Sequence, residues 1–142
     1  MRTIKQVLGD KGWDTWSITP EETVFDAIQL MAEKRIGALL VMEGDQLTGI
    51  VSERDYAREV ILKGRSSKET PVRDIMTSKV VTIPSNFRVE DSLLIMSKNR
   101  IRHLPIVDNN RVVGIVSIGD LVKHIIYEQQ STIEHLEKYI KG

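Results

Sequence analysis

Cysteine is absent from this chain of 142 residues. A protein without thiols forms no disulfide bond, ligates no metal through sulfur and performs no catalysis through a thiolate. The sequence also lacks two common phosphate-binding loops, because neither GxxxxGK[ST] nor GxGxxG occurs in it. A P-loop site or a Rossmann dinucleotide site is therefore not expected.

An excess of charge of one sign and long apolar runs are missing as well. Lysine plus arginine equals aspartate plus glutamate at 20 each, so no overall field attracts nucleic acid or an anionic membrane. No apolar run approaches the roughly eighteen residues of a membrane-spanning helix, and the first residues lack the apolar core of a signal peptide. We therefore expect a cytoplasmic protein with no membrane partner and no nucleic-acid partner.

The residue arrangements typical of enzymes are not found either. No pair of histidines has metal-ligand spacing, and no Ser-His-Asp arrangement is recognisable. Nothing else in the sequence joins a nucleophile to its base. We expect neither an enzyme nor a metal site.

What the sequence does contain is a long internal repeat. Residues 23–56 align without a gap on residues 88–121, sixty-five positions later. Two long copies do not suit a solenoid, which needs at least three short units. They predict two small modules packed on one another, with paired clefts. Eleven of the thirty-four aligned pairs are identical: Val24/Val89, Asp26/Asp91, Met31/Met96, Arg35/Arg100, Ile36/Ile101, Leu39/Leu104, Gly49/Gly114, Ile50/Ile115, Val51/Val116, Ser52/Ser117 and Asp55/Asp120.

Each repeat predicts elements in the order β-α-β-β-α. Apolar residues recur from Val24 to Ala32 with the spacing of an amphipathic helix, which we expect Gly37 to end. The elements expected in the first repeat are a strand at 16–19, this helix, strands at 38–42 and 47–52, and a helix at 53–62. Those expected in the second repeat are a strand at 80–82, a helix at 89–99, strands at 103–107 and 112–117, and a helix from 119.

The fold class expected from this order is α/β (α+β), in one tandem module. We place the first repeat, with an N-terminal arm, at 1–63, an exposed linker at 64–70, the second repeat at 71–130 and a C-terminal helical tail at 131–142. In the tail, Ile133, Leu136 and Ile140 lie on one apolar stripe, which could brace a dimer or dock a partner.

The sharpest shared motif is Gly-Ile-Val-Ser-x-x-Asp, at 49–55 and 114–120, where a strand ends and a helix begins. One interpretation is a capping box, in which the serine and the acidic residue satisfy free backbone N–H groups. The other is a nucleotide site, because a helix N-terminus favours an anion. Serine would then face phosphate, and aspartate would accept from the ribose hydroxyls. Two occurrences, both with Asp instead of the Glu or Gln usual in capping boxes, favour the nucleotide.

The residues ahead of the middle strand differ between the repeats. Gly37-Ala38 stands in the first repeat and Arg102-His103 in the second. The second pair is either two solvated side chains near a helix C-terminus, which the helix dipole favours, or a clamp for phosphate. The residues alone leave these two interpretations about equal.

Taken in order, these motifs resemble the CBS domain, the module named after cystathionine beta-synthase. The resemblance rests on 18–20, 36–41 and 49–55 in the first repeat, and on 72–77, 81–84, 101–108 and 114–120 in the second. It covers almost the whole chain, which is similar to a stand-alone tandem CBS protein of bacteria or archaea. The resemblance implies that the two repeats pack sheet to sheet about a pseudo-two-fold axis.

The resemblance also implies two clefts that bind adenosine-containing ligands. Asp55 and Asp120 would hold ribose hydroxyls, with Ser52 and Ser117 near the phosphates. The backbone at the start of each repeat and the middle strands would surround the adenine. The residues implied there are Ile18, Thr19, Pro20, Gly37, Ala38, Leu39, Thr82, Ile83, Pro84, Leu104 and Pro105.

Phosphate contacts are implied across the pseudo-axis. Arg102 and His103 would reach the phosphate of a ligand in the Asp55 cleft. Arg54 would do the same in the Asp120 cleft, where the second repeat has only Gly119. Gly37-Ala38 departs from the family pattern, so unequal occupancy of the two clefts is expected.

The sequence therefore predicts a non-catalytic regulatory module for energy sensing that changes shape on binding. Its ligand would be AMP, ADP, ATP or NAD, bound as a signal and not as a catalytic cofactor. We expect a homodimer, with the adenosine-containing small molecule and an unknown protein as its partners. The alternative is a structural dimerisation module whose clefts are vestigial.

Overall fold

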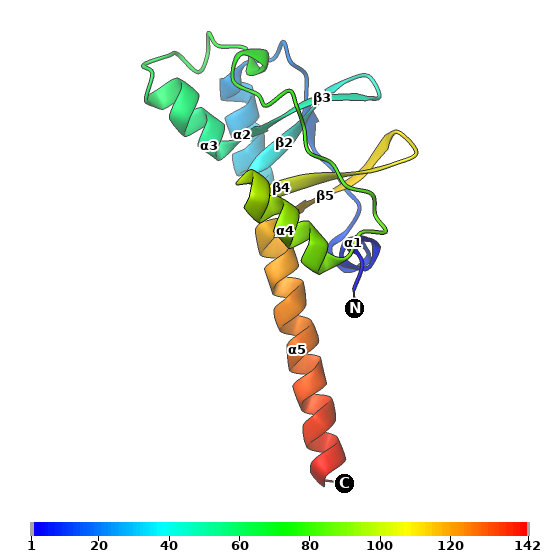
Figure 1. Cartoon of the computed structure of the whole chain (residues 1–142). Helices are drawn as coiled ribbons and strands as arrows, with labels where there is room; N and C mark the ends of the chain where they lie inside the picture. Colours follow the sequence, from blue (N-terminus) through cyan, green and yellow to red (C-terminus); the bar gives the residue numbers. More distant parts are fainter. Residues whose placement is uncertain (1, 142) are drawn as a thin grey trace.

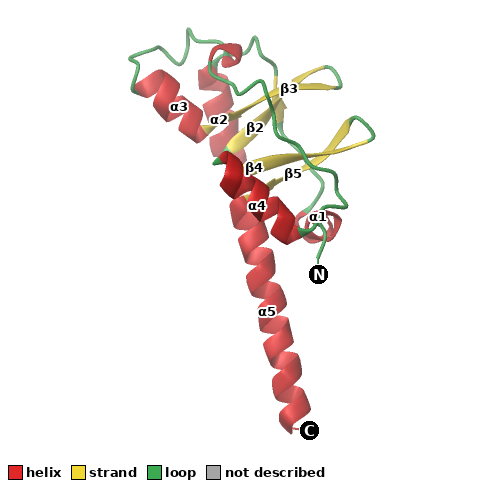
Figure 2. Ribbon diagram, viewed as in Figure 1, coloured by secondary structure: helices red, strands yellow, loops and turns green. Residues whose placement is uncertain are grey.

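The structure is a computed structural model and describes residues 2–141 (Figures 1 and 2). Met1 and Gly142, the outer ends of the predicted arm and tail, lie outside the described residues. In chain order the elements are α1 (Ile4–Lys11), β1 (Ser17–Ile18), α2 (Val24–Lys34), β2 (Ala38–Glu43), β3 (Gln46–Ser52), α3 (Glu53–Tyr56), the π-helix η1 (Ala57–Ile61), the 3-10 helix η2 (Val72–Asp74), α4 (Val89–Asn99), β4 (His103–Asp108), β5 (Arg111–Ser117) and α5 (Ile118–Lys141).

The long helices of the two repeats, α2 and α4, are built alike. Each has 11 residues and follows an extended residue, Thr23 or Arg88. Each ends at an arginine in the left-handed conformation, with φ 55° at Arg35 and 54° at Arg100. The expectation that Gly37 ends α2 is therefore wrong: the chain has already turned at Arg35, two residues earlier. The identical arginines of the repeat mark this turn.

Each repeat also forms the predicted antiparallel hairpin. Strand β2 pairs with β3 and strand β4 pairs with β5, and equivalent residues stand opposite one another in the two hairpins. The turns use left-handed residues, Gly44 in the first hairpin and Asn109-Asn110 in the second, as tight hairpins require. These hairpins and the helices confirm the predicted mixed α/β fold class.

The predicted strand at 80–82 does not form, and within residues 2–141 the second sheet consists of β4 and β5 alone. In the first repeat, Leu40 donates its N–H to Trp16, and this bond helps to join β1 to β2. The residue aligned with Leu40 is Pro105, which has no N–H to donate. Only an isolated parallel bridge between Ile83 and Ile106 remains.

The two repeats exchange their leading segments. Ile4, Val7 and Leu8 of α1 are buried in the core of the second repeat, whereas Val72 and Ile75 are buried in the core of the first. Two glycines make room for these segments. A Cβ at Gly114 would lie 2.8 Å from Leu8 Cδ2, and one at Gly49 would lie 2.6 Å from Met76 Sδ. The identical glycines of the shared motif therefore leave the space into which the leading segment of the other repeat packs.

Helix α5 is far longer than its counterpart in the first repeat. Its first turns pack on the second repeat, and the rest extends away from the body of the molecule (Figure 1). All residues from 129 to 140 are exposed. Among the described residues, no helix combines the length and apolar character needed to cross a membrane.

Candidate functional site

Two pockets open where the repeats meet, each at the start of the helix that follows a hairpin. The Asp55 pocket has a volume of about 310 Å³ and the Asp120 pocket about 360 Å³. Gly37, Ala38 and His103 line both pockets, so the residues that differ most between the repeats lie at the junction. The two pockets therefore share one wall and differ in the others.

In the Asp55 pocket the serine and the aspartate form a capping box. The Ser52 N–H donates to Asp55 Oδ2 at 2.9 Å, and the Asp55 N–H donates to Ser52 Oγ at 3.2 Å. The Ser52 hydroxyl lies 3.0 Å from the same Oδ2. Among residues 2–141, the hydrogen bonds to this carboxylate all end on Oδ2, which leaves Oδ1 outside the cap.

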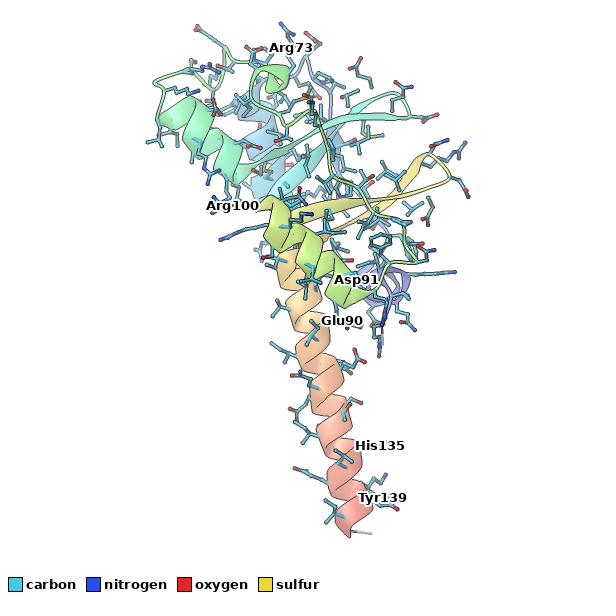
Figure 3. The ribbon with its side chains drawn as sticks, in the orientation of Figure 1. Arg73, Glu90, Asp91, Arg100, His135 and Tyr139 are labelled. Atoms are coloured by element: carbon cyan, nitrogen blue, oxygen red, sulfur yellow. The ribbon has the colours of Figure 1, made fainter. Side chains whose placement is uncertain are left out.

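The Asp55 pocket is rich in arginine. Arg100 and Arg102 come from the connection between α4 and β4 in the second repeat, and Figure 3 shows Arg100 at the end of α4 that meets the first repeat. Arg54 and Arg58 come from the first repeat, Arg58 from the π-helix that continues α3. The pocket also contains Glu53 and Asp55, so four guanidinium groups face two carboxylates.

Burial raises the pKa of Asp55 above its ordinary value, because burial disfavours the charged carboxylate. The hydrogen bonds from Ser52 and the charge of Arg58 act in the opposite direction and do not outweigh burial. The Asp55 pocket thus combines a partly desolvated carboxylate with an excess of positive charge. Both features suit a ligand that carries hydroxyl donors and phosphate.

In the Asp120 pocket the same cap is joined by a lysine. The Ser117 N–H donates to Asp120 Oδ2 at 2.8 Å, and the Asp120 N–H donates to Ser117 Oγ at 3.0 Å. Lys11 Nζ, at the end of α1, also lies 2.8 Å from Asp120 Oδ2. Burial alone would raise the pKa of Asp120, but the Lys11 and Ser117 contacts together lower it below its ordinary value.

The Asp120 pocket has no such excess of positive charge. Lys11 and Arg35 are balanced by Asp14 and Asp120. Lys11 and Asp120 also line a further pocket of about 580 Å³ between α1 and α5. The ion pair between Lys11 and the Asp120 carboxylate therefore lies where these two pockets meet.

His103 lies between the Asp55 and Asp120 pockets and depends on the small residue opposite. A Cβ on Gly37 would lie 3.4 Å from His103 Cε1, so a side chain there would be in van der Waals contact with the imidazole. Burial lowers the pKa of His103, Asp120 opposes this effect, and Lys11 and Arg102 reinforce it. The imidazole is therefore neutral near pH 7 in the unliganded protein.

The structure brings together part of the predicted site. The predicted residues that line the Asp55 pocket are Gly37, Ala38, Ser52, Arg54, Asp55, Arg102 and His103. Those that line the Asp120 pocket are Gly37, Ala38, His103, Ser117 and Asp120. Arg54 lies in the Asp55 pocket, not in the Asp120 pocket where we expected it, because it follows Ser52 on the helix that borders its own repeat.

The remaining predicted residues do not line either pocket. Ile18, Ile83, Leu39 and Leu104 are buried in the two cores. The others are Thr19, Pro20, Thr82, Pro84, Pro105 and Gly119. An adenine contact through the backbone of these segments stays a prediction.

Several lining residues were not anticipated from the sequence. They are Lys11, Gly12, Asp14, Trp16, Arg35, Ile36 and Ile115 in the Asp120 pocket, and Ile50, Glu53, Arg58, Thr77, Arg100 and Ile101 in the Asp55 pocket. Arg35 and Arg100 could have been found from the sequence, because the two repeats have an identical arginine at this position. Lys11 could not, because it precedes the aligned segments.

Comparison with known proteins agrees with this arrangement of two repeats. The family model of the CBS domain matches residues 14–62 and again residues 72–127. The chain belongs to the CBS-domain family. The CBS domain-containing protein CBSX3, mitochondrial, of Arabidopsis thaliana is 40% identical, over 99% of this chain and 72% of that protein. The predicted family is therefore confirmed.

Solved CBS structures share the fold. A putative signal-transduction protein with CBS domains from Burkholderia ambifaria superposes with a TM-score of 0.87 at 47% identity, over 90% of this chain and 96% of that chain. The CBS domain pair of protein MJ0100, solved in complex with 5-methylthioadenosine and S-adenosyl-L-methionine, superposes with a TM-score of 0.80 at 24% identity, over 90% of this chain and 98% of that chain. The confirmed fold is thus that of a CBS pair, a regulatory module.

Proposed function

We propose that this CBS pair is a non-catalytic sensor of adenine nucleotides that signals by changing shape when AMP, ADP, ATP or NAD binds. The observation that carries the proposal is the Asp55 pocket, where a carboxylate with a raised pKa lies among four arginines. The carboxylate suits ribose hydroxyls as donors, and guanidinium groups suit phosphate. The adenosine-type ligands bound by the CBS pair of MJ0100 support the same ligand class.

The free carboxylate oxygens support a ribose contact. In both caps the described hydrogen bonds end on Oδ2, so Oδ1 of Asp55 and of Asp120 can accept a ligand hydroxyl while the cap persists. A helix N-terminus at each pocket adds favourable potential for an anion. We expect the Asp55 pocket to prefer phosphorylated ligands, and the Asp120 pocket to bind less charged ligands or to bind more weakly.

A homodimer belongs to this proposal, because a single tandem pair leaves apolar helix residues exposed, among them Leu94, Ile118 and Val122. We expect a dimer to position the pockets of both copies and to present a joint surface to a protein partner. We also expect the protein to act in the cytoplasm.

A structural dimerisation module with vestigial clefts is the second candidate. The observation that favours it is that both serine–aspartate pairs form complete capping boxes, which already give each aspartate a structural role. Under this alternative, the aspartates contribute only to folding.

A thermal-shift series separates the two candidates. The protein is unfolded, stripped of bound small molecules, refolded and melted with AMP, ADP, ATP, NAD or adenosine. A ligand at one hundred times its Kd stabilises the folded state by about 2.7 kcal/mol, which raises Tm by several degrees. Unchanged Tm values with every adenine nucleotide at millimolar concentration would contradict the sensor and favour the structural module.

A further inference from the structure

Helix α5 carries two different apolar faces. One face packs on the body of the molecule through Leu121, which is fully buried, and Ile125, which is partly buried in the second core. The other face is exposed along the whole helix. Its residues are Val122, Ile126, Ile133, Leu136 and Ile140, each between 43% and 81% exposed. We call these five residues, together with Gln129, the α5 seam.

The α5 seam has the spacing of a coiled coil. Its members alternate in steps of four and three residues, which places Ile126, Ile133 and Ile140 at the a positions of a heptad and Val122, Gln129 and Leu136 at the d positions. Isoleucine occupies all three a positions, and Leu136 gives one d position the leucine that, with β-branched residues at a, favours a two-stranded parallel coil.

The tail of α5 gains no support from its own chain. Residues 129–140 are all exposed, and Figure 3 shows His135 and Tyr139 on the part of the helix that extends beyond the other elements. An isolated helix of about twelve residues is marginal in water. A partner that covers the apolar seam would therefore stabilise the helical tail.

At three positions beside the seam, the second repeat exposes a larger or more apolar side chain than the first repeat. Two of three exposed apolar positions there are polar in the first repeat, and the third is smaller. The aligned pairs are Leu94/Gln29, Ile118/Glu53 and Val122/Ala57. The exposed apolar surface is thus continuous from α4 and the start of α5 into the tail.

We propose that the occupant of the α5 seam is the α5 seam of a second copy of this chain, in a parallel two-stranded coiled coil. The inference rests on the homodimer proposed above and names its surface. A parallel pair places Gln129 opposite Gln129 of the second copy, where the two amides can bond to each other and fix the register. It also brings the two Leu94 surfaces side by side.

Charges beside the seam are compatible with self-pairing. In a parallel coil each g position faces an e position of the second copy. The g positions are Ile118, Ile125, Thr132 and Tyr139, and the e positions are Lys123, Gln130 and Glu137. Because no g residue is charged, two identical helices meet without like-charge repulsion.

The natural absence of cysteine provides a direct test. Leu136→Cys places one thiol in the seam, where same-residue pairs in a parallel coil lie within the Cα separation of roughly 4.4–6.8 Å that a disulfide spans. His135→Cys, equally on the tail but at a c position outside the seam, is the matched control. We expect mild oxidation to convert most of the Leu136→Cys protein, and little of the His135→Cys protein, to a disulfide-linked dimer.

An antiparallel pair would give a different result. In the antiparallel register that overlaps the whole seam, Leu136 would lie opposite Ile126, so the two thiols of the Leu136→Cys dimer would lie about 15 Å apart at 1.5 Å per residue. Absence of a crosslink in the Leu136→Cys protein therefore overturns the parallel coil.

Light scattering on the wild-type chain shows whether the parallel coil alone is wrong or the homodimer as well. A dimer mass for the wild type, together with no crosslink in the Leu136→Cys protein, places the dimer on another surface and overturns the coil alone. A monomer at tens of micromolar overturns both the coil and the proposed homodimer.

Truncation after Gln130 supplies a second measurement. It leaves both pockets and both cores intact, so circular dichroism and thermal melting of the body report folding independently. We expect the truncated chain to dissociate to monomers at concentrations where the full chain is dimeric. Truncated protein that stays folded and remains dimeric with unchanged affinity overturns the coil.

Discussion

The Lys11 ammonium lies 2.8 Å from Asp120 Oδ2, and this ion pair makes two otherwise similar pockets unlike. Asp55 stands at the same place in the first repeat, where four arginines line the pocket and burial raises its pKa. Asp120 has a lowered pKa because Lys11 and Ser117 stabilise its charge against burial. The Asp55 carboxylate is thus free to meet a ligand, whereas the Asp120 carboxylate already pairs with Lys11.

Replacing Lys11 by methionine tests this ion pair. Lys11→Met should raise the pKa of Asp120, because burial then acts without the lysine. Loss of this partly exposed pair should cost stability by at most about 1 kcal/mol. NMR titration of the aspartate carboxyl carbons measures the pKa, and Lys5→Met, an exposed lysine on the same helix, is the control.

The same variant has a stability signature with pH. A carboxyl group with a lowered folded pKa contributes stability above its unfolded value, and this contribution is lost as pH falls through the folded pKa. The stability difference between wild type and Lys11→Met should therefore be present at pH 7 and vanish in acid, below the Asp120 value of the folded protein. A difference that is the same at pH 7 and in acid would show that Lys11 contributes packing and not charge.

A pair of substitutions at Asp55 separates ligand binding from capping. Asp55→Asn keeps an oxygen that can accept from the Ser52 N–H but removes the charge that attracts ribose hydroxyls. Asp55→Ala removes both. We expect both variants to weaken AMP binding in calorimetry, and only Asp55→Ala to lose about 1 kcal/mol of stability.

The control for this pair is Asp45→Asn, in the exposed turn between β2 and β3. It should change neither binding nor stability. Normal AMP affinity in both Asp55 variants, together with a lower melting temperature for Asp55→Ala, would identify the aspartate as a cap only.

Binding of a phosphorylated ligand should depend on the protonation of His103. Burial lowers the pKa of His103 below its ordinary value of 6.5, with Lys11 and Arg102 acting in the same direction and Asp120 against it. A bound phosphate favours the protonated imidazole, so AMP affinity should rise as pH falls from about 7 toward about 5.5, with proton uptake. Calorimetry in buffers of different ionisation enthalpy measures the uptake.

His103→Asn should abolish this dependence for AMP, and adenosine should show little of it in either protein. The unliganded wild type should lose some stability over the same range, because the unfolded chain takes up the proton more readily than the folded chain. AMP affinity that stays constant with pH in the wild type would remove His103 from the phosphate site.

The sequence predicted those parts of the fold that depend on local pattern. The helices and the hairpins follow from apolar periodicity, turn residues and the repeat. The capping box was one of two interpretations of the serine–aspartate pairs, and the structure forms it in both repeats. The prediction of a strand at 80–82 was wrong. Pro105 lacks an N–H group, but this matters only because β4 lies beside that segment, which the sequence does not show. The expectation that Gly37 ends α2 was wrong. Glycine is the usual residue in the left-handed conformation at a helix end, but here Arg35 adopts it.

The site was less accessible to sequence reasoning because it depends on long-range packing. Lys11 reaches Asp120 only because α1 is buried in the core of the other repeat, which no local pattern shows. Gly37 departs from the family pattern, and in the structure it lies next to the imidazole of His103. Arg102 and His103, by contrast, line the Asp55 pocket as the resemblance implied.

The most direct test of the sensor is calorimetry of AMP and adenosine on wild type, Arg102→Ala and the control Arg111→Ala, which changes an exposed arginine at the start of β5. Arg102 is a guanidinium in the Asp55 pocket, and a hydrogen bond to a charged group contributes roughly 1.5–3 kcal/mol. We expect Arg102→Ala to weaken AMP binding about tenfold or more, to leave adenosine binding nearly unchanged, and Arg111→Ala to resemble wild type. No binding of AMP to the wild type, or equal losses for AMP and adenosine, would contradict a nucleotide sensor that reads phosphate in this pocket.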